Sequence, residues 1–188
     1  MCTRLLDYDA FLFHAAVVSY AGRGYAFAAK SGTGKSTHVA QWMHALGNRV
    51  MVVNGDKPIL RWCGGEGAGA AGGEGYRAPG AFLAYGTPYC GKESWGQNTS
   101  VPLRAVCFIE RCKPGEPDCL KRLEDDGEII NRMMNQILLP KDPVLAVRQL
   151  DLLDKLVTCV PFYVLRCTPT RAAFDAAFQM TLCDNENE

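Results

Sequence analysis

The sequence predicts an α/β domain whose N-terminal half is rich in strands and whose C-terminal half is mainly helical. Three observations lead to this fold class. Short apolar and β-branched runs recur before residue 111, helical periodicity dominates after residue 118, and a glycine-bearing loop separates a strand from a helix at 29–37. Of the 188 residues, 48% are hydrophobic, which suffices for a packed core. We therefore expect a single domain over 1–188.

The elements of the first third follow from local patterns. Residues 11–19 and 25–29 are apolar and predict two strands, joined by a turn at 20–24. Residues 35–46 predict a helix, because the apolar side chains of Val39, Trp42, Met43 and Leu46 recur at helical spacing and Gly47 supplies a stop signal. Two further strands are expected, at 49–53 and 59–63.

The middle of the chain begins with a glycine-rich segment. Eight of the 17 residues at 64–80 are glycine, which predicts a flexible surface loop or hairpin tip. Residues 81–85 and 101–110 then predict strands. The segment between them, 86–100, is polar and rich in glycine, so it is either a functional loop or a solvated turn.

Helical patterns dominate the last third. Residues 118–139 carry apolar side chains among charges and predict one or two helices, interrupted afterwards by Pro140 and Pro143. The remaining elements are a helix at 144–158, a strand at 161–167 and a helix at 170–182.

Charge and composition exclude several classes of protein. The 20 basic and 20 acidic residues balance, which is not the basic excess expected of a nucleic-acid binder. No apolar run approaches the roughly 18 residues needed to cross a bilayer, and the first residues lack the features of a signal peptide. We therefore expect no membrane partner and a cytoplasmic location. The nine cysteines form no CxxC pair, which favours reduced thiols over a disulfide framework.

The segment at 29–37 carries the clearest chemistry. It predicts a phosphate-binding loop, or P-loop, in which glycine lets backbone N–H groups turn inward and the helix N-terminus adds partial positive charge. The side chain of Lys35 would reach the β and γ phosphates, and the Ser36 hydroxyl would bind Mg²⁺. The residues expected to hold the nucleotide are Ser31, Gly32, Thr33, Gly34, Lys35, Ser36 and Thr37. The first glycine of the GxxxxGK[ST] pattern is replaced by Ala29.

Asp56 is the acidic residue that we expect to help bind the Mg²⁺ ion. It follows the expected strand 49–53, so its carboxylate would face the phosphates from the carboxyl end of a neighbouring strand. The alternative is an ordinary β-turn, because Asn54-Gly55 and Gly55-Asp56 both favour turns. Similar alternatives apply to His14, Lys92 and Glu93. His14 is either an active-site group or a histidine of the core. Lys92 and Glu93 are either active-site groups or solvated residues of a loop.

These residues together resemble a known family. The order and spacing of His14, the loop SGTGKST and Asp56 are similar to the catalytic domain of HPr kinase/phosphorylase, whose P-loop core is akin to that of ATP-dependent phosphoenolpyruvate carboxykinase. The segment YGTPYCGKESWGQNTSVPLRAVCFIER also resembles small HPr-kinase-like proteins, and the likeness spans about residues 11–111. It implies an active-site role near the phosphates for His14 and, weakly, a symmetric homo-oligomer.

One position departs from the family pattern. The resemblance implies two adjacent acids at the strand end, the first taking a proton from the acceptor hydroxyl and the second lying beside the metal. Here the pair is Gly55-Asp56, so the first acid is missing. Asp56 then does both tasks, or His14 or Glu93 takes the proton, or phosphoryl transfer is impaired.

The leading hypothesis is therefore an ATP-dependent, Mg²⁺-requiring kinase acting on a hydroxyl, either a serine of a small protein or peptide or a small metabolite. Asp56, His14 and Lys35 are its expected catalytic residues, Ser36 and Asp56 its metal ligands. Lys92, Glu93 and Arg104 are candidates for clamping the acceptor or the phosphate. Two alternatives remain: a nucleotide-binding regulatory module with little catalysis, and a phosphotransferase that uses pyrophosphate or ADP as donor.

Overall fold

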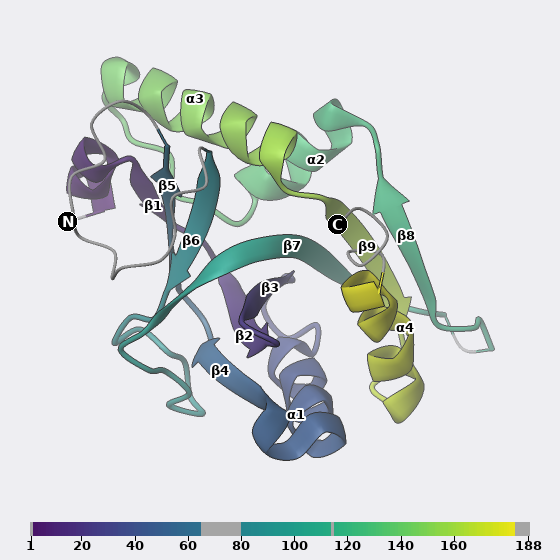
Figure 1. Ribbon diagram of the computed structural model, residues 1–188. Coiled ribbons are helices and arrows are strands. Elements are labelled where there is room, and N and C mark those ends of the chain that lie inside the picture. The colour runs from purple at the N-terminus through teal and green to yellow at the C-terminus, as the bar shows by residue number, and fades with distance from the viewer. Residues whose placement is uncertain (1, 65–79, 114, 183–188) are drawn as a thin grey trace.

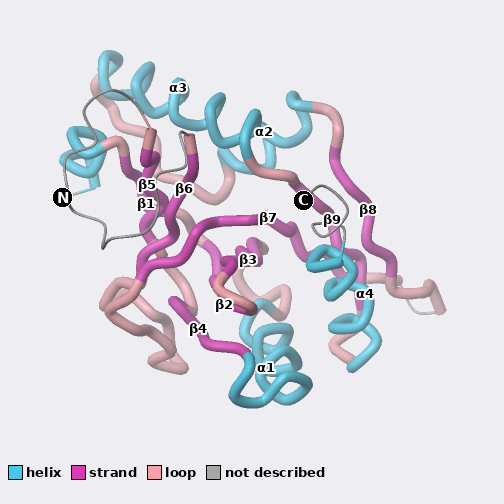
Figure 2. Tube along the Cα trace, viewed as in Figure 1, coloured by secondary structure: helices cyan, strands magenta, loops and turns pink. Residues whose placement is uncertain are grey.

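The computed structural model describes residues 2–64, 80–113 and 115–182, and within them the chain is a mixed α/β protein built around one curled sheet (Figures 1 and 2). The strands of the described chain are β1 (Ala10–Leu12), β2 (Ala15–Tyr20), β3 (Arg23–Ala28), β4 (Val50–Asn54), β5 (Ile59–Cys63), β6 (Ala81–Tyr85), β7 (Ser100–Arg111), β8 (Cys119–Leu123) and β9 (Phe162–Cys167). The α-helices are α1 (Lys35–Leu46), α2 (Asp126–Met134), α3 (Pro143–Cys159) and α4 (Arg171–Leu182), with 3₁₀ turns at Cys2–Tyr8 and Gly47–Arg49.

Strand direction brings four strand ends to one edge of the sheet. β3 and β9 both run parallel to β7, on its two sides, and β2 pairs antiparallel with both β3 and β4. The carboxyl ends of β3, β4, β7 and β9 therefore meet at the same edge, which is where α/β proteins bind their ligands. The first residues of β7 pair instead with β6, which continues the sheet through β5 to β1.

Helices cover both faces of the sheet. Along β3 the side chains alternate: Tyr25 and Phe27 join the core under α1 and α4, whereas Ala26 and Ala28 join the core under α2 and α3. Both sets are buried, as expected of a central strand that helices cover on both faces. Figure 1 shows α1 and α4 on one side of the sheet and α2 and α3 on the other.

The helix α1 is held in place by its aromatic side. Trp42 is fully buried and packs against Tyr25, Phe27 and Phe174, with ring centroids 5.3 to 5.9 Å apart. This packing fixes the end of α1 that begins at Lys35 directly after the loop that follows β3. The strand, loop and helix expected around residues 29–37 are thus all present.

Two predicted elements are wrong in part. Residues 119–123, expected to begin a helix, form the strand β8, which pairs antiparallel with β9 along its whole length. The sequence CLKRL does not alternate strictly between apolar and polar residues, so its pattern did not separate this short edge strand from the helix that follows. That helix, α2, begins only after Asp125, whose carboxylate accepts a hydrogen bond from the Glu128 N–H.

The first predicted strand is also interrupted. Residues 11–19 divide into β1 and β2, and Phe13 and His14 lie in the break between them. The glycine-rich prediction at 64–80 falls almost wholly outside the described residues. Over the part of the chain that the structure describes, none of the helices combines the length and the apolar character needed to cross a membrane.

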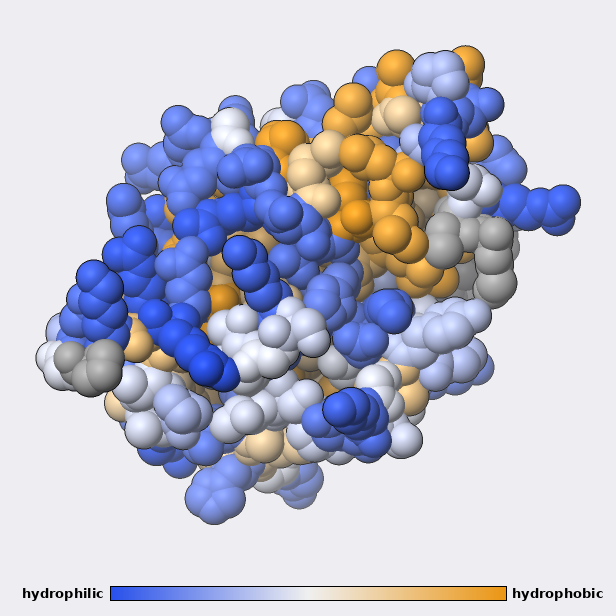
Figure 3. Space-filling model, turned by 180° about the vertical axis from the view of Figure 1, so that it is seen from behind, coloured by the Kyte–Doolittle hydropathy of each residue, from blue (hydrophilic) through white to orange (hydrophobic). Residues whose placement is uncertain are grey.

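Apolar side chains gather on the face that carries α3. The large exposed ones there are Leu138, Leu139, Val144, Val147 and Leu150. Figure 3 shows hydrophobic surface concentrated on one part of the molecule when it is seen from behind. The predicted homo-oligomer stays a prediction, because nothing in the structure shows what covers this face.

Candidate active site

The loop after β3 is shaped by its glycines. Gly32 and Gly34 adopt positive φ angles of 78° and 123°, which residues with a Cβ rarely do. The Thr33 N–H donates to the Lys30 carbonyl at 3.1 Å and closes a tight turn. Ala29, at the position of the missing first glycine, is only 4% exposed and packs in the core beneath α1.

The first backbone N–H groups of α1 have no hydrogen-bond acceptor within the helix. The first bond of the helix runs from the His38 N–H to the Gly34 carbonyl at 2.9 Å, so the amides of Lys35, Ser36 and Thr37 precede the helical ladder. The first turn of this helix carries no acidic residue, and Gly34 provides no side-chain cap. Its partial positive charge is therefore available to an anion.

Arg111 secures the loop from the neighbouring strand. It ends β7, and its guanidinium donates to the Gly32 carbonyl at 2.5 Å and to the Thr33 carbonyl at 3.2 Å. These bonds direct two loop carbonyls toward Arg111. No sequence motif predicts a role for Arg111. The signal that points to it is the parallel pairing of the strand 101–110 with β3, which places the next side chain beside the loop.

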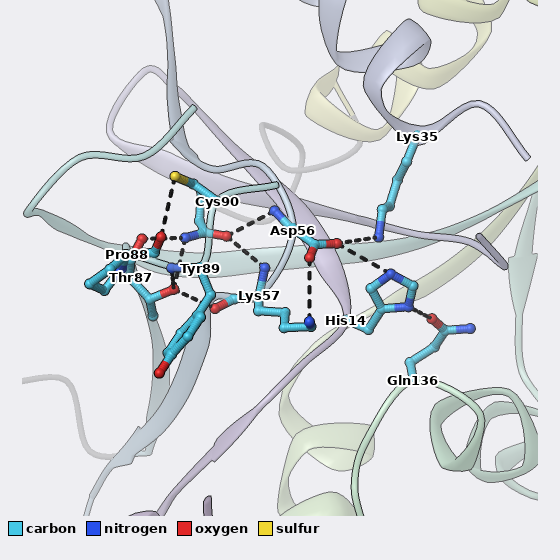
Figure 4. Close-up of polar contacts among 10 residues, drawn as sticks. His14, Lys35, Asp56, Lys57, Thr87, Pro88, Tyr89, Cys90 and Gln136 are labelled. Carbon is cyan, nitrogen blue, oxygen red and sulfur yellow. Dashed lines mark hydrogen bonds and ion pairs between the residues drawn. The ribbon is translucent and has the colours of Figure 1, made fainter. Parts of the chain in front are cut away.

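Asp56 is the point on which three basic side chains converge (Figure 4). Its Oδ1 lies 3.3 Å from His14 Nε2 and 3.5 Å from Lys35 Nζ, and its Oδ2 lies 3.6 Å from Lys57 Nζ. These distances exceed the roughly 2.8 Å of a tight charge-assisted hydrogen bond. A bound ligand can therefore replace these contacts of Asp56 without breaking a strong ion pair. The site thus joins Lys35 of α1, Asp56 after β4 and His14 between β1 and β2.

Burial sets the charge of these groups. The Lys35 side chain is only 11% exposed, and this burial lowers its pKa, while the carboxylates of Asp56 and Glu93 oppose the shift. Burial and the nearby Lys35 charge likewise lower the pKa of His14 below 6.5, against the attraction of Asp56. His14 is therefore neutral near pH 7 and available as a hydrogen-bond donor or a base.

Gln136 orients His14. The side-chain Oε1 of Gln136 accepts from His14 Nδ1 at 3.1 Å, and the backbone carbonyl of Gln136 accepts from the backbone N–H of His14 at 2.8 Å. Gln136 itself is buried. Because Gln136 Oε1 accepts, His14 Nδ1 carries the ring proton, and Nε2 of the neutral ring faces Asp56 with its lone pair. No sequence motif points to Gln136, because it lies 122 residues from His14 along the chain.

Asn54 positions Asp56. The Asn54 side chain is fully buried, and its Oδ1 accepts from the backbone N–H groups of Asp56 (2.9 Å) and Lys57 (2.7 Å). Its Nδ2 donates to the carbonyl and hydroxyl oxygens of Thr87 at 3.0 and 3.1 Å. The turn anticipated at Asn54-Gly55-Asp56 is thus an Asx turn that also presents the carboxylate, so the two readings of this segment are compatible.

Asn54→Ala is expected to lower the free energy of unfolding by about 3 kcal/mol, because it leaves several buried polar groups without partners. Urea denaturation followed by circular dichroism measures this change. Thr87→Ser keeps the hydroxyl that Asn54 contacts and serves as the matched control, with a loss nearer about 1 kcal/mol for the missing methyl group. Equal stability of Asn54→Ala and the wild type would show that the Asn54 bonds do not hold the turn.

Gly55 has no room for a side chain. A Cβ built at this position would lie 2.6 Å from the Cys90 carbonyl oxygen and 3.3 Å from that of Trp95. The segment 86–99 is bonded onto the strand end here, with the Gly55 N–H donating to the Trp95 carbonyl at 2.7 Å and the Gln97 N–H to the Val53 carbonyl at 3.1 Å. The acid that the family resemblance implies at 55 is therefore excluded by backbone packing.

Gly55→Asp is accordingly expected to destabilise the protein rather than to restore a second acid. Overpacking of this kind costs about 1–3 kcal/mol. The clash cannot be relieved by a side-chain rotation, because the atoms in the way are the backbone carbonyl oxygens of Cys90 and Trp95. The melting temperature and the rate of any phosphoryl transfer are the two measurements. A variant that keeps its melting temperature and transfers phosphate faster would contradict this account of Gly55.

The remaining predicted residues differ in position. Glu93 lies in the exposed turn at 91–94, close to Asp56: a Cβ built at Gly91 would be 3.3 Å from Asp56 Cβ and 3.5 Å from Glu93 Oε2. Lys92 is exposed in the same turn, and its role as a clamp stays a prediction. Arg104 lies seven residues before Arg111 on β7 and lines a separate cavity with Arg122 and Glu124. Its role as a clamp stays a prediction.

Two cavities flank the loop. One of about 420 Å³ lies on the side of α2 and is lined by Lys30, Glu110, Arg132, Asn135 and Gln136 among others. Glu110 there accepts from Arg132 at 2.6 Å and from Arg166 at 3.2 Å, and these two arginines lower the pKa of Glu110 against the opposing effect of burial. The second cavity, of about 400 Å³, lies between the start of α1 and the turn that joins β9 to α4.

Comparisons with known proteins leave the function open. No family model and no curated protein sequence matches the chain. Among solved structures, the chain is similar to the Hpr(Ser) kinase/phosphatase from Coxiella burnetii, with 13% sequence identity and a TM-score of 0.38. The match covers 93% of this chain and 89% of the other. A likeness at this level assigns neither an activity nor a substrate.

Proposed function

We propose that the protein is an ATP-dependent, Mg²⁺-requiring phosphotransferase that moves the γ-phosphoryl group to a hydroxyl. The observation that carries this proposal is the convergence of Lys35 Nζ and His14 Nε2 on Asp56 Oδ1, at 3.5 and 3.3 Å, beside the glycine loop. Phosphoryl transfer commonly uses a cation and helix N-terminal amides to bind the phosphates and a carboxylate to take the proton of the nucleophile.

The phosphates would be bound by the loop. The amides at the start of α1 and the Lys35 ammonium would hold the β and γ phosphates. For this, Lys35 leaves Asp56, which it contacts only loosely. Arg111 keeps the Gly32 and Thr33 carbonyls from turning toward the phosphates, where they would repel them. This part of the site binds and orients the donor.

The donor set fits Mg²⁺. The ion prefers oxygen ligands and is commonly held by one or two protein side chains together with substrate phosphates and water. Here the Ser36 hydroxyl and the Asp56 carboxylate would hold it, and the ion would supply charge neutralisation at the phosphates. Among the described residues no three His, Cys, Asp or Glu side chains are arranged to hold a metal ion by themselves. The nucleotide and water would complete the coordination.

Asp56 is the base that we propose. The acceptor oxygen forms a bond to the γ phosphorus as the bond from that phosphorus to the β–γ bridging oxygen breaks, leaving ADP, and the hydroxyl proton passes to the carboxylate. His14, held by Gln136, places its unprotonated Nε2 beside the carboxylate and is the alternative proton acceptor. The Asn54 bonds fix the backbone from which Asp56 projects.

The acceptor would enter from the α2 side. The 420 Å³ cavity there is lined by Gln136, which also contacts His14, and by polar groups of Arg132 and Asn135. It adjoins the loop at Lys30 and Thr33. A serine of a small protein or peptide and the hydroxyl of a small metabolite both suit such a polar cavity. The cytoplasmic location and the absence of a nucleic-acid partner stay predictions from the sequence.

A second function is favoured by Gly55. The missing acid at 55 cannot be restored without moving the segment 86–99, so the site has one carboxylate where the resemblance implies two. A nucleotide-binding regulatory module with little catalysis would need only the loop, Lys35 and the metal. In that case ATP binds and no transfer occurs.

Incubation with γ-labelled ATP and Mg²⁺ separates the two functions. Purified protein is assayed alone, with lysate from its own source, and with added small-molecule fractions, and label transfer and ATP binding are both measured. Transfer that is lost in Asp56→Ala supports the kinase. Tight binding without transfer to any fraction supports the regulatory module, and the absence of ATP binding would overturn both. Transfer from labelled pyrophosphate or ADP instead of ATP would identify a different donor.

A further inference from the structure

The mechanism above does not use the second cavity beside the loop. Its volume of about 400 Å³ falls within the range of small-molecule sites. Thr37, His38 and Gln41 of α1 line one side, and the segment 167–170, between β9 and α4, lines the other. Figure 1 shows α1 and α4 on the same face of the sheet, and the packing of Trp42 against Phe174 joins them.

His38 brings an unused hydrogen-bond donor to this cavity. The residue is only 4% exposed, and its Nε2 accepts from the Trp42 Nε1–H at 3.1 Å. A nitrogen that accepts carries no proton, so the proton of the ring is on Nδ1. Nδ1 is buried and has no hydrogen-bond partner in the part of the chain that the structure describes. Buried donors are rarely left unpaired, so a ligand with an acceptor would satisfy it.

The direction of the bound nucleotide follows from the strand order. In the sheet, β3 and its loop lie between β4, which ends at Asp56, and the β7–β9 side, which ends at residues 167–170. A nucleotide whose γ phosphate lies at Lys35 and Asp56 therefore extends across the loop, away from β4. Its other end reaches the cavity, which begins at Thr33 and Gly34 of the loop itself.

We infer that the nucleoside of the donor nucleotide occupies the cavity between α1 and the β9–α4 turn, and that His38 Nδ1–H donates a hydrogen bond to it. This inference rests on the proposed function, because it needs a nucleotide whose phosphates lie in the loop. It makes His38 a recognition residue that distinguishes a nucleotide from inorganic polyphosphate, although it contacts none of the reacting atoms.

Two substitutions of His38 separate its two nitrogens. His38→Gln places an amide oxygen near the former Nε2, where it can still accept from Trp42, and removes the donor at Nδ1. His38→Asn places an amide N–H near the former Nδ1 and keeps that donor. Calorimetry with ATP and, separately, with inorganic tripolyphosphate measures binding to the wild type and both variants, each checked by its melting temperature.

The expected result is that His38→Gln binds ATP about 5- to 10-fold more weakly than the wild type, as for a lost neutral hydrogen bond, whereas His38→Asn stays within about twofold. Tripolyphosphate should bind all three proteins equally. Equal ATP binding by the wild type and His38→Gln, or an equal loss of both ligands, would overturn the inference.

Gln41→Trp gives an independent test that does not depend on the His38 variants folding. A large ring at 41 fills the cavity and should abolish most of the ATP affinity while sparing tripolyphosphate. Unchanged ATP affinity in this variant would place the nucleoside elsewhere. A wild type that binds tripolyphosphate as tightly as ATP would overturn the nucleoside site and spare the phosphate site. A wild type that binds neither ligand would instead overturn the proposed function.

Discussion

Asp56→Asn is expected to lower the rate of phosphoryl transfer by about 100-fold or more while changing the affinity for ATP little. The amide has nearly the same shape as the carboxylate but cannot take up the hydroxyl proton, and general bases commonly contribute about 10²- to 10⁴-fold. The backbone of residue 56 stays in place, because Asn54 holds its N–H and not its side chain. Single-turnover kinetics gives the rate, and calorimetry gives the ATP affinity.

Glu93→Gln is the matched control for this prediction. Glu93 lies close to Asp56 in the turn at 91–94, and it is the other carboxylate that the sequence suggests as a base. Its loss should lower the rate by less than about fivefold, because the base is retained. If Glu93→Gln instead lost as much as Asp56→Asn, the proton would pass to Glu93. Equal and small losses in both variants would leave His14 as the base.

Local pattern was enough to predict the part of the site that is continuous in sequence. The loop lies between β3 and α1, whose apolar spacing shows directly in the residues 25–46. Asp56 was predictable because it follows the next strand along the chain, and the ends of strands that run in the same direction meet at one edge. His14 was expected from the resemblance, and its position in a break between β1 and β2 was not.

The residues that hold these groups in place were beyond reach, because they come from distant parts of the chain. Gln136 meets His14 over 122 residues, and Arg111 meets Gly32 over 79. Neither contact follows from a motif, since each depends on which strands and helices become neighbours. The error at residues 119–123 has the same origin. The five residues mix apolar and charged side chains without regular alternation, and they form a strand because β9 offers them an edge.

Gly55 shows how tertiary packing explains a departure from a motif. From the sequence alone, the missing acid indicated either a transfer of its role or an impaired enzyme. The structure adds the cause, because the segment 86–99 places the Cys90 carbonyl where a side chain at 55 would begin. The same segment also supports Asn54 through Thr87. One segment therefore both excludes the second acid and fixes the carboxylate that remains.

Lys35→Ala is expected to reduce the affinity for ATP by about 10-fold or more and the rate of phosphoryl transfer by about 10²- to 10³-fold. The ammonium would contact the phosphates in the ground state and again as charge develops on them. Folding should not suffer, because removing a largely buried cation whose pKa is lowered by burial also removes its desolvation cost. Melting temperatures with and without ATP test both statements, since a ligand that binds the folded state raises the melting temperature according to its affinity.

Lys57→Ala is the control that makes this result specific. Lys57 contacts the other oxygen of the same carboxylate at 3.6 Å, but its side chain is 51% exposed and lies outside the loop. An exposed ion pair is worth about 0–1 kcal/mol, so its loss should change ATP affinity and rate only a few-fold. If the two lysine variants lost ATP-induced stabilisation equally, general positive charge near Asp56 would explain ATP binding. Lys35 would then have no particular role at the phosphates, and the glycine loop would cease to be the argument for phosphoryl transfer.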